Sequence, residues 1–97
     1  MAKRSPKDQS KHDKAVEASA RYYKQQGYKV QADLHGHDQP KTINNRRPDV
    51  RATKGGKEVI VEVETPDSLS ADKAQHSAFQ KYAEGKSNTK FRKKVTK

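Results

Sequence analysis

The amino-acid sequence predicts a small α/β domain in which a helix, three strands, a second helix and a fourth strand follow one another (αβββαβ). Three observations predict this fold class. Two segments repeat their apolar residues at helical spacing, several short segments alternate apolar and polar residues as half-buried strands do, and a Gly-Gly pair separates two of those strands. With 97 residues, the chain is long enough for one domain and too short for two.

The first helix is expected over residues 14–26, and the first strand follows it. Gly27 is a natural C-terminal cap for this helix. In the strand, apolar residues alternate with Lys29, Gln31 and Asp33. The residues expected on the inner faces are Ala15, Val16, Ser19, Ala20 and Tyr23 of the helix and Tyr28, Val30, Ala32 and Leu34 of the strand.

The second and third strands follow a polar loop at residues 35–45. They are expected over residues 46–53 and 58–64. Between them lie Gly55 and Gly56, a favoured pair for a two-residue hairpin turn.

The second helix is expected to begin after Ser70, a residue favoured at N-caps, and to carry Asp72 in its first turn. Gly85 ends it, and Phe91 and Val95 indicate a short last strand. The expected apolar stripe of this helix consists of Ala71, Ala74, Ala78 and Tyr82, flanked by Phe79.

The net charge of the chain indicates the class of molecule that it binds. The chain has 22 Lys and Arg against 12 Asp and Glu, a net charge of +10, and such a surface attracts polyanions, so nucleic acid is the expected partner. Residues 1–13 lack apolar periodicity and are expected to form a flexible basic arm, which leaves residues 14–97 as a single domain with a basic C-terminal end. Ile, Leu, Val and Phe make up only 13 of 97 residues, a level typical of disordered chains. Their grouping between the two basic ends argues instead for a small folded core.

Other classes are excluded by composition. Without Cys there is no disulfide framework and no thiolate metal site, so any metal must be held by oxygen or imidazole. No apolar run approaches the roughly 18 residues that a membrane span needs, and the polar N-terminus lacks the apolar stretch of a secretory signal. The chain is therefore expected to be a soluble, cytoplasmic protein.

The Gly-Gly turn predicts how the two strands that it joins are paired. If Lys54 lies opposite Lys57, Asp49 lies opposite Glu62. The opposite face of the hairpin is then wholly apolar, because Pro48, Val50, Ala52, Val59, Val61 and Val63 occupy it. The remaining pairs on the charged face are Arg47 with Glu64 and Arg51 with Ile60.

This pairing predicts a cation site. Opposed side chains have Cβ atoms about 5 Å apart, where two carboxylates repel by roughly 3 kcal/mol at an effective dielectric on the order of 20. A divalent cation would relieve the repulsion between Asp49 and Glu62, and hard oxygen ligands suit Mg²⁺ or Mn²⁺. The alternative is that the two acids pair with Arg47 and Arg51 and that this face is simply solvated.

The hairpin resembles the signature of the PD-(D/E)XK nuclease superfamily, the restriction-endonuclease-like fold. The resemblance is carried by Arg47-Pro48-Asp49-Val50 and, after the turn, by Val61-Glu62-Val63-Glu64. It covers residues 14–95 and is nearest to small archaeal Holliday-junction-resolvase-like nucleases. It implies a mixed four-stranded sheet flanked by helices, and the element order found above is that of the superfamily core.

The resemblance also implies roles for site residues. Asp49 would be the central metal-binding acid and Glu62 the second metal ligand. The third position usually carries Lys, whereas Glu64 stands there in this chain. Some restriction enzymes of this fold carry Glu at that position and remain active, with the acid acting as a base or an extra ligand.

Three further residues are candidates through the same resemblance. Lys73 lies at the start of the second helix, where displaced lysines occur in the superfamily, and Gln75 is placed to face the site. Glu17 is the nearest candidate for the acid that family members often supply from the first helix. For Lys73 and Gln75, the alternative is an ordinary solvent-facing position.

The four histidines are expected to lie outside the site. His35 and His37 flank Gly36 in a polar loop that offers no scaffold for a metal, so a mobile loop near the substrate is the favoured interpretation. His12 and His76 are isolated in the sequence and are expected at the surface.

The functional hypothesis is a Mg²⁺- or Mn²⁺-dependent phosphodiesterase that cleaves DNA. It would recognise structure, as at a junction, flap or end, because no helix looks built for reading the major groove. The few aromatic residues argue against a stacking platform for single strands. The residues expected to hold flanking phosphates are Arg47, Arg51, Lys90, Arg92, Lys93 and Lys94.

Two alternatives remain open at this point. The first is a nucleic-acid-binding module on the same fold that has lost catalysis through the replacement at Glu64. The second is a small basic protein that docks on RNA or on an acidic partner and has no site in its hairpin. The resemblance also makes a homodimer reasonable.

Overall fold

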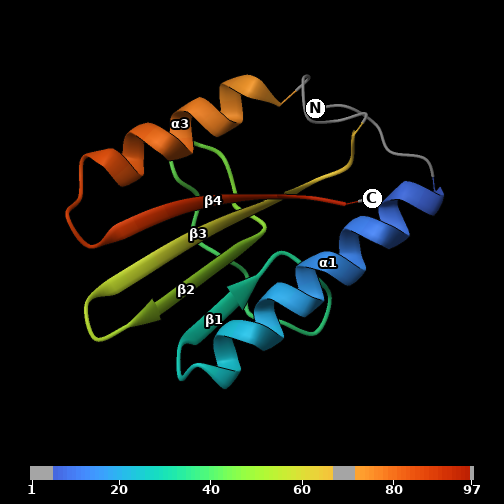
Figure 1. Cartoon of the computed structure of the whole chain (residues 1–97), viewed down its shortest axis with the longest axis horizontal. Helices are drawn as coiled ribbons and strands as arrows, with labels where there is room; N and C mark the ends of the chain where they lie inside the picture. Colours follow the sequence, from blue (N-terminus) through green and yellow to red (C-terminus); the bar gives the residue numbers. More distant parts are fainter. Residues whose placement is uncertain (1–5, 67–71, 97) are drawn as a thin grey trace.

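A mixed four-stranded sheet lies between two helices (Figure 1). The computed structural model describes residues 6–66 and 72–96. The sheet order is β1-β2-β3-β4, with β1, β2 and β3 antiparallel and β4 parallel to β3, so the predicted αβββαβ fold class is confirmed. The elements are α1 (Pro6–Gln25), β1 (Lys29–Ala32), β2 (Val50–Lys54), β3 (Lys57–Glu64), α3 (Lys73–Glu84) and β4 (Thr89–Val95).

The hairpin between β2 and β3 has the predicted register. Lys54 pairs with Lys57 and Val50 pairs with Val61. Gly55 and Gly56 form the turn with φ angles of +53° and +85°, a left-handed backbone that glycine adopts without a steric cost. The turn therefore sets which residues of the two strands face each other.

The face of the sheet beneath α1 forms the larger part of the core. Val16 and Ala20 of α1 are fully buried and pack on the strands. The strand residues of this cluster are Val30, Ala32, Val50, Ala52, Val59, Val61 and Val63. The alternation read from the sequence thus identifies the buried face of the strands correctly.

α1 is longer than expected. It begins at Pro6, so the expectation of a flexible arm over residues 1–13 is wrong for residues 6–13, while residues 1–5 lie outside the described part of the chain. Proline is well tolerated at the first helical position, and Asp8 lies in the first turn, where a negative charge is favourable. His12 is buried one turn before Val16 and extends the inner face of the helix.

α3 covers the other face of the sheet, over β3 and β4. Its fully buried Phe79 packs with Ile60 of β3 and with Ile43, which the long connection between β1 and β2 carries across to this face. The expected stripe is wrong in part. Ala74 is exposed, and the buried residues of α3 are His76, Phe79 and Ala83. The apolar stripe was predicted partly on the wrong side of α3 because His76, a polar residue, occupies one of the buried positions.

The start of α3 also differs from expectation. Asp72 is the residue before the helix, whereas the predicted N-cap Ser70 and the stripe residue Ala71 lie outside the described residues. Within residues 6–66 and 72–96, no helix combines the length and the apolar character needed to cross a membrane.

Candidate active site

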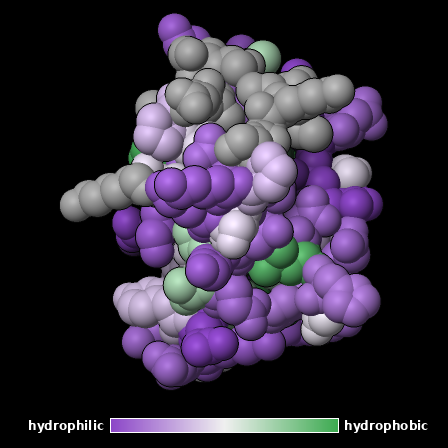
Figure 2. All heavy atoms as spheres, turned by 90° about the vertical axis from the view of Figure 1, so that its right-hand side faces the viewer, coloured by the Kyte–Doolittle hydropathy of each residue, from purple (hydrophilic) through white to green (hydrophobic). Residues whose placement is uncertain are grey.

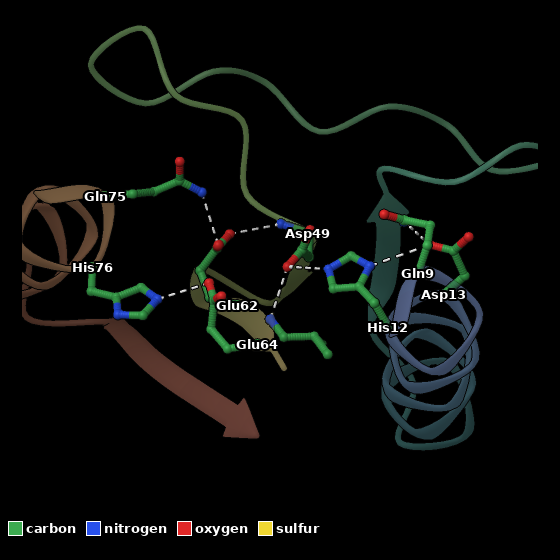
Figure 3. Close-up of polar contacts among 9 residues, drawn as sticks. Gln9, His12, Asp13, Asp49, Glu62, Glu64, Gln75 and His76 are labelled. Carbon is green, nitrogen blue, oxygen red and sulfur yellow. Dashed lines mark hydrogen bonds and ion pairs between the residues drawn. The ribbon is translucent and has the colours of Figure 1, made fainter. Parts of the chain in front are cut away.

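Six polar side chains meet near the end of the sheet where β3 ends and β2 begins (Figure 3). Both helices contribute from their N-terminal halves, so the site joins residues that are far apart in the sequence. The six are His12 from α1, Asp49 directly before β2, Glu62 and Glu64 from β3, and Gln75 and His76 from α3.

Asp49 and Glu62 are tied together across the hairpin. The backbone N–H of Asp49 donates to Oε1 of Glu62 at 3.0 Å, and the backbone N–H of Val63 donates to Oδ2 of Asp49 at 2.8 Å. Each carboxylate thus accepts a hydrogen bond from the backbone of the neighbouring strand. The predicted neighbourhood of the two acids is confirmed.

The side chain of Asp49 reaches towards α1. Nε2 of His12 lies 3.3 Å from Oδ2 of Asp49, and its Nδ1 lies 3.2 Å from Oδ1 of Asp13. Gln9 in turn donates to Asp13 at 2.8 Å (Figure 3). His12 is buried, so its expected surface position is wrong: the early start of α1 places it against the sheet.

Glu62 reaches in the opposite direction, towards α3. It is 2% exposed, and its Oε2 accepts a hydrogen bond from Nε2 of Gln75 at 2.9 Å. Burial, followed by the nearby charge of Asp49, raises the pKa of Glu62 from its ordinary value of 4.5 to about 9. At neutral pH without a metal ion, Glu62 therefore carries a proton.

Glu64 and His76 form a buried pair beside Glu62. Nε2 of His76 lies 2.9 Å from Oε1 of Glu64, and these residues are 7% and 0% exposed. The expected surface position of His76 is therefore wrong. The alternative of a solvated acidic face is wrong as well, because α3 covers both glutamates.

The donor set of this cluster fits a divalent metal ion. Glu62, Glu64 and His76 each offer one ligand atom, and these atoms lie within 4.8 Å of one another. Carboxylate and imidazole ligands of this kind bind Mn²⁺ and related ions. Glu64 and His76 thus lie close enough to Glu62 to share one ion with it, and Asp49 adjoins Glu62 through a backbone hydrogen bond.

The other predicted catalytic residues lie in different surroundings. Lys73 is exposed at the first position of α3. The Glu17 carboxylate is hydrogen-bonded to Nε2 of His37, and its Oε1 lies 3.8 Å from Nη2 of Arg21. Because Glu17 lies five residues after His12, it is about 7.5 Å further along the helix and on another side of it. The first-helix residue beside Asp49 is His12 instead.

The predicted phosphate contacts divide into two groups. Arg51 is engaged by Glu58 and Gln31 within the fold, and Arg47 donates to Gln39 at 2.6 Å. Neither arginine is recorded in an ion pair with Asp49 or Glu62 among the described residues. The four exposed cations of β4 are Lys90, Arg92, Lys93 and Lys94.

A model of one family, described as AHJR-like (REase_AHJR-like), matches residues 4–97. The chain belongs to the AHJR-like family. This family is restriction-endonuclease-like, of the PD-(D/E)XK type, so the suspected superfamily is confirmed. No curated protein and no solved structure gave a significant match.

Membership of the AHJR-like family indicates a nuclease with a nucleic-acid substrate. Families of this type usually use a divalent metal ion, and the buried acidic and histidine side chains of this chain are suited to hold one.

The pKa of Glu62 predicts that the metal-free protein loses stability as the pH rises. The folded state keeps the Glu62 proton up to a pKa of about 9, whereas the unfolded chain releases it near 4.5, so stability falls between these values. One proton corresponds to at most about 1.4 kcal/mol of unfolding free energy per pH unit. Urea unfolding in EDTA from pH 5.5 to 9 measures the slope. Glu62→Gln should flatten it, and equal slopes in the two proteins would contradict the prediction.

Proposed function

We propose that this AHJR-like protein is a metal-dependent phosphodiesterase that cleaves DNA and recognises its structure, such as a junction, flap or end. The observation that carries the proposal is the cluster of Glu62, Glu64 and His76, whose ligand atoms lie within 4.8 Å of one another beside Asp49. Such a buried acidic group in a chain of net charge +10 suits the combination of a metal ion and a phosphodiester.

The metal site would consist of Glu62 with Glu64 and His76, next to Asp49. When bound, Mg²⁺ or Mn²⁺ polarises a phosphoryl oxygen and lowers the pKa of a water molecule. A mixed set of carboxylate and imidazole ligands favours Mn²⁺ over Mg²⁺, because Mg²⁺ prefers oxygen ligands alone.

The residues of the chain prepare this site in three ways. The Val63 N–H and His12 hold the Asp49 carboxylate in place. Gln75 orients Glu62, which must release its proton before it can serve as a metal ligand. His76 holds Glu64 in the position where related enzymes usually carry Lys, so a histidine and a carboxylate replace the lysine ammonium.

Substrate phosphates would be held by cations around this centre. Arg47 is 45% exposed at its side chain, and Lys93 pairs with Glu62 in the register of β3 and β4. Contacts of this kind position a nucleic-acid backbone and do not read its sequence. Both helices bury one face against the sheet, which agrees with recognition of shape.

A specific observation also supports the second candidate, an inactive nucleic-acid-binding module. The usual Lys position holds Glu64, which is fully buried with His76. A module of this kind would bind nucleic acid with a steep salt dependence and would not cut it.

The test is a cleavage assay on supercoiled plasmid, linear duplex, flap and four-way-junction DNA with Mn²⁺, Mg²⁺ or EDTA. We expect metal-dependent cleavage by the wild type and its loss in Asp49→Ala and Glu62→Ala. Glu84→Gln is the matched control, because this carboxylate is exposed at the far end of α3. Cleavage that persists in both alanine variants would rule out the site, and a wild type inactive with every metal would favour the binding module.

A further inference from the structure

A groove runs between α1 and the edge strand β4. α1 packs mainly over β1, β2 and β3, and β4 lies at the edge of the sheet beyond them (Figure 1). The groove has a volume of about 600 Å³, which is in the range of ligand-binding clefts. The lining residues that matter here are Tyr22, Tyr23, Tyr28, Lys54, Lys90 and Arg92.

Three of the four tyrosines of the chain line this groove. The rings of Tyr22 and Tyr23 meet edge to face with centroids 5.0 Å apart, and Tyr23 meets Tyr28 in the same way at 5.3 Å. Tyr22 is 56% exposed, so part of its ring is open to a ligand. The low aromatic content of the sequence argued against a stacking platform, but a total count does not show that three of the four tyrosines lie together.

The groove is strongly basic. Lys54, Lys57, Lys90 and Arg92 line it, and Glu58 is the single acid among the described residues that line it. Glu58 is engaged by Arg51 and accepts hydrogen bonds from Tyr82 and Thr89. A second hollow shares Tyr22, Tyr23 and Arg92 with the groove and adds Lys93 and Lys94, so the positive charge continues along β4.

We propose that the tyrosine-lined groove between α1 and β4 binds a single-stranded segment of nucleic acid. Its bases would stack on the exposed face of Tyr22, and its phosphates would contact Lys90 and Arg92. A duplex keeps its bases stacked inside and gains nothing from an exposed ring, whereas a single strand gains from both features. Lysines on an edge strand also prevent pairing with other sheets, but that role requires no tyrosines.

The groove runs along β4 on the face of the sheet that α1 covers, whereas Glu62 lies on the face that α3 covers. Lys90 pairs with Val59 of β3 and Lys93 pairs with Glu62, so these two levels are about 10 Å apart along the strands. The end of the molecule where α1 begins and β4 ends is mostly hydrophilic, as a surface that follows a nucleic-acid backbone would be (Figure 2). The idea that one bound strand extends from the groove to the acids rests on the proposed function. Binding of a single strand in the groove does not depend on it.

The test measures fluorescence anisotropy of labelled dT12, U12 and a 12-base-pair duplex with the full chain in EDTA, where metal-dependent cleavage cannot occur. Tyr22→Ala should weaken binding of dT12 and U12 about tenfold, and Tyr22→Phe should stay within about twofold of the wild type, because stacking needs only the ring. Lys90→Ala should lower the slope of log affinity against log salt by about 0.7. Lys81→Ala is the control, because this lysine is exposed on α3 outside the groove.

A second readout is tyrosine fluorescence, which is usable because the chain has no Trp. We expect dT12 to quench it in the wild type and in Lys81→Ala. The proposal is overturned if Tyr22→Ala binds dT12 as tightly as the wild type, or if Tyr22→Ala weakens duplex binding equally. If the protein binds single strands as expected but never cleaves DNA, the proposal for the groove stands and only the nuclease proposal is refuted.

Discussion

Replacing Glu62 with glutamine should abolish metal-dependent cleavage while leaving the metal-free fold intact. A metal ion contributes several kcal/mol of charge stabilisation to phosphodiester hydrolysis, so loss of its ligand should slow cleavage about a thousandfold or more. Mn²⁺ binding, measured by calorimetry, should disappear together with activity. The effect is large because Glu62 is buried between Asp49 and the pair of Glu64 and His76.

The fold should survive because the glutamine amide resembles the protonated carboxyl group. In the metal-free protein Glu62 carries a proton, as its pKa of about 9 implies. The new amide oxygen would still accept the Asp49 N–H, and its NH₂ group would donate to Gln75 after the Gln75 amide turns over. Circular dichroism and unfolding in urea check this point.

Glu84→Gln is the matched control for charge removal, and it should cleave at the wild-type rate. A Glu62→Gln protein that remains folded and still cleaves DNA in Mn²⁺ would contradict the assignment of Glu62 as a ligand. Unfolding of the variant at pH 6 would contradict the inferred protonation, because the amide is equivalent to the neutral acid at that pH.

The second large effect is expected from Phe79→Ala, which should remove most of the unfolding free energy of the protein. Phe79 is fully buried, packs with Ile43 and Ile60, and has its ring centroid 6.0 Å from that of Phe91. Truncation of a buried phenylalanine costs about 3–5 kcal/mol. Small domains have unfolding free energies as low as about 5 kcal/mol, so this loss removes most of the total.

Phe79→Ala should also disturb the candidate active site, because α3 carries Gln75 and His76. Phe79→Leu keeps most of the buried apolar area and should lose less stability. Tyr22→Ala removes a ring that is largely exposed, and its stability should change by no more than about 0.5 kcal/mol. Urea unfolding of the three variants measures these differences. A loss in Phe79→Ala no greater than that in Tyr22→Ala would show that Phe79 does not hold α3 on the sheet.

The hairpin shows how much of the site was predictable from the sequence. A two-residue turn determines the register of the strands beside it, and the alternation of apolar residues determines which face is buried. Both signals are local, so the neighbourhood of Asp49 and Glu62 followed from them. Gln75 was named only through the family resemblance, and in the structure its side chain donates a hydrogen bond to Glu62.

The histidines show what the sequence did not reveal. His12 contacts Asp49 across 37 positions and His76 contacts Glu64 across 12, and no local pattern marks such contacts. One available signal was spacing, since His12 lies four residues before the buried Val16 and His76 three before Phe79. A histidine on an inner helix face is hidden when only apolar residues are counted.

By itself, the sequence determined the order of the elements, the pairing of β2 with β3 and the basic character that points to nucleic acid, because turns, alternation and net charge depend on neighbouring residues or on composition alone. Only the tertiary structure decided that two helices far apart in the sequence bring histidines to the acids, that Glu62 and Glu64 are buried, and that three tyrosines gather beside β4. These features depend on how the helices dock against the sheet, and docking is set by the packing of the whole core.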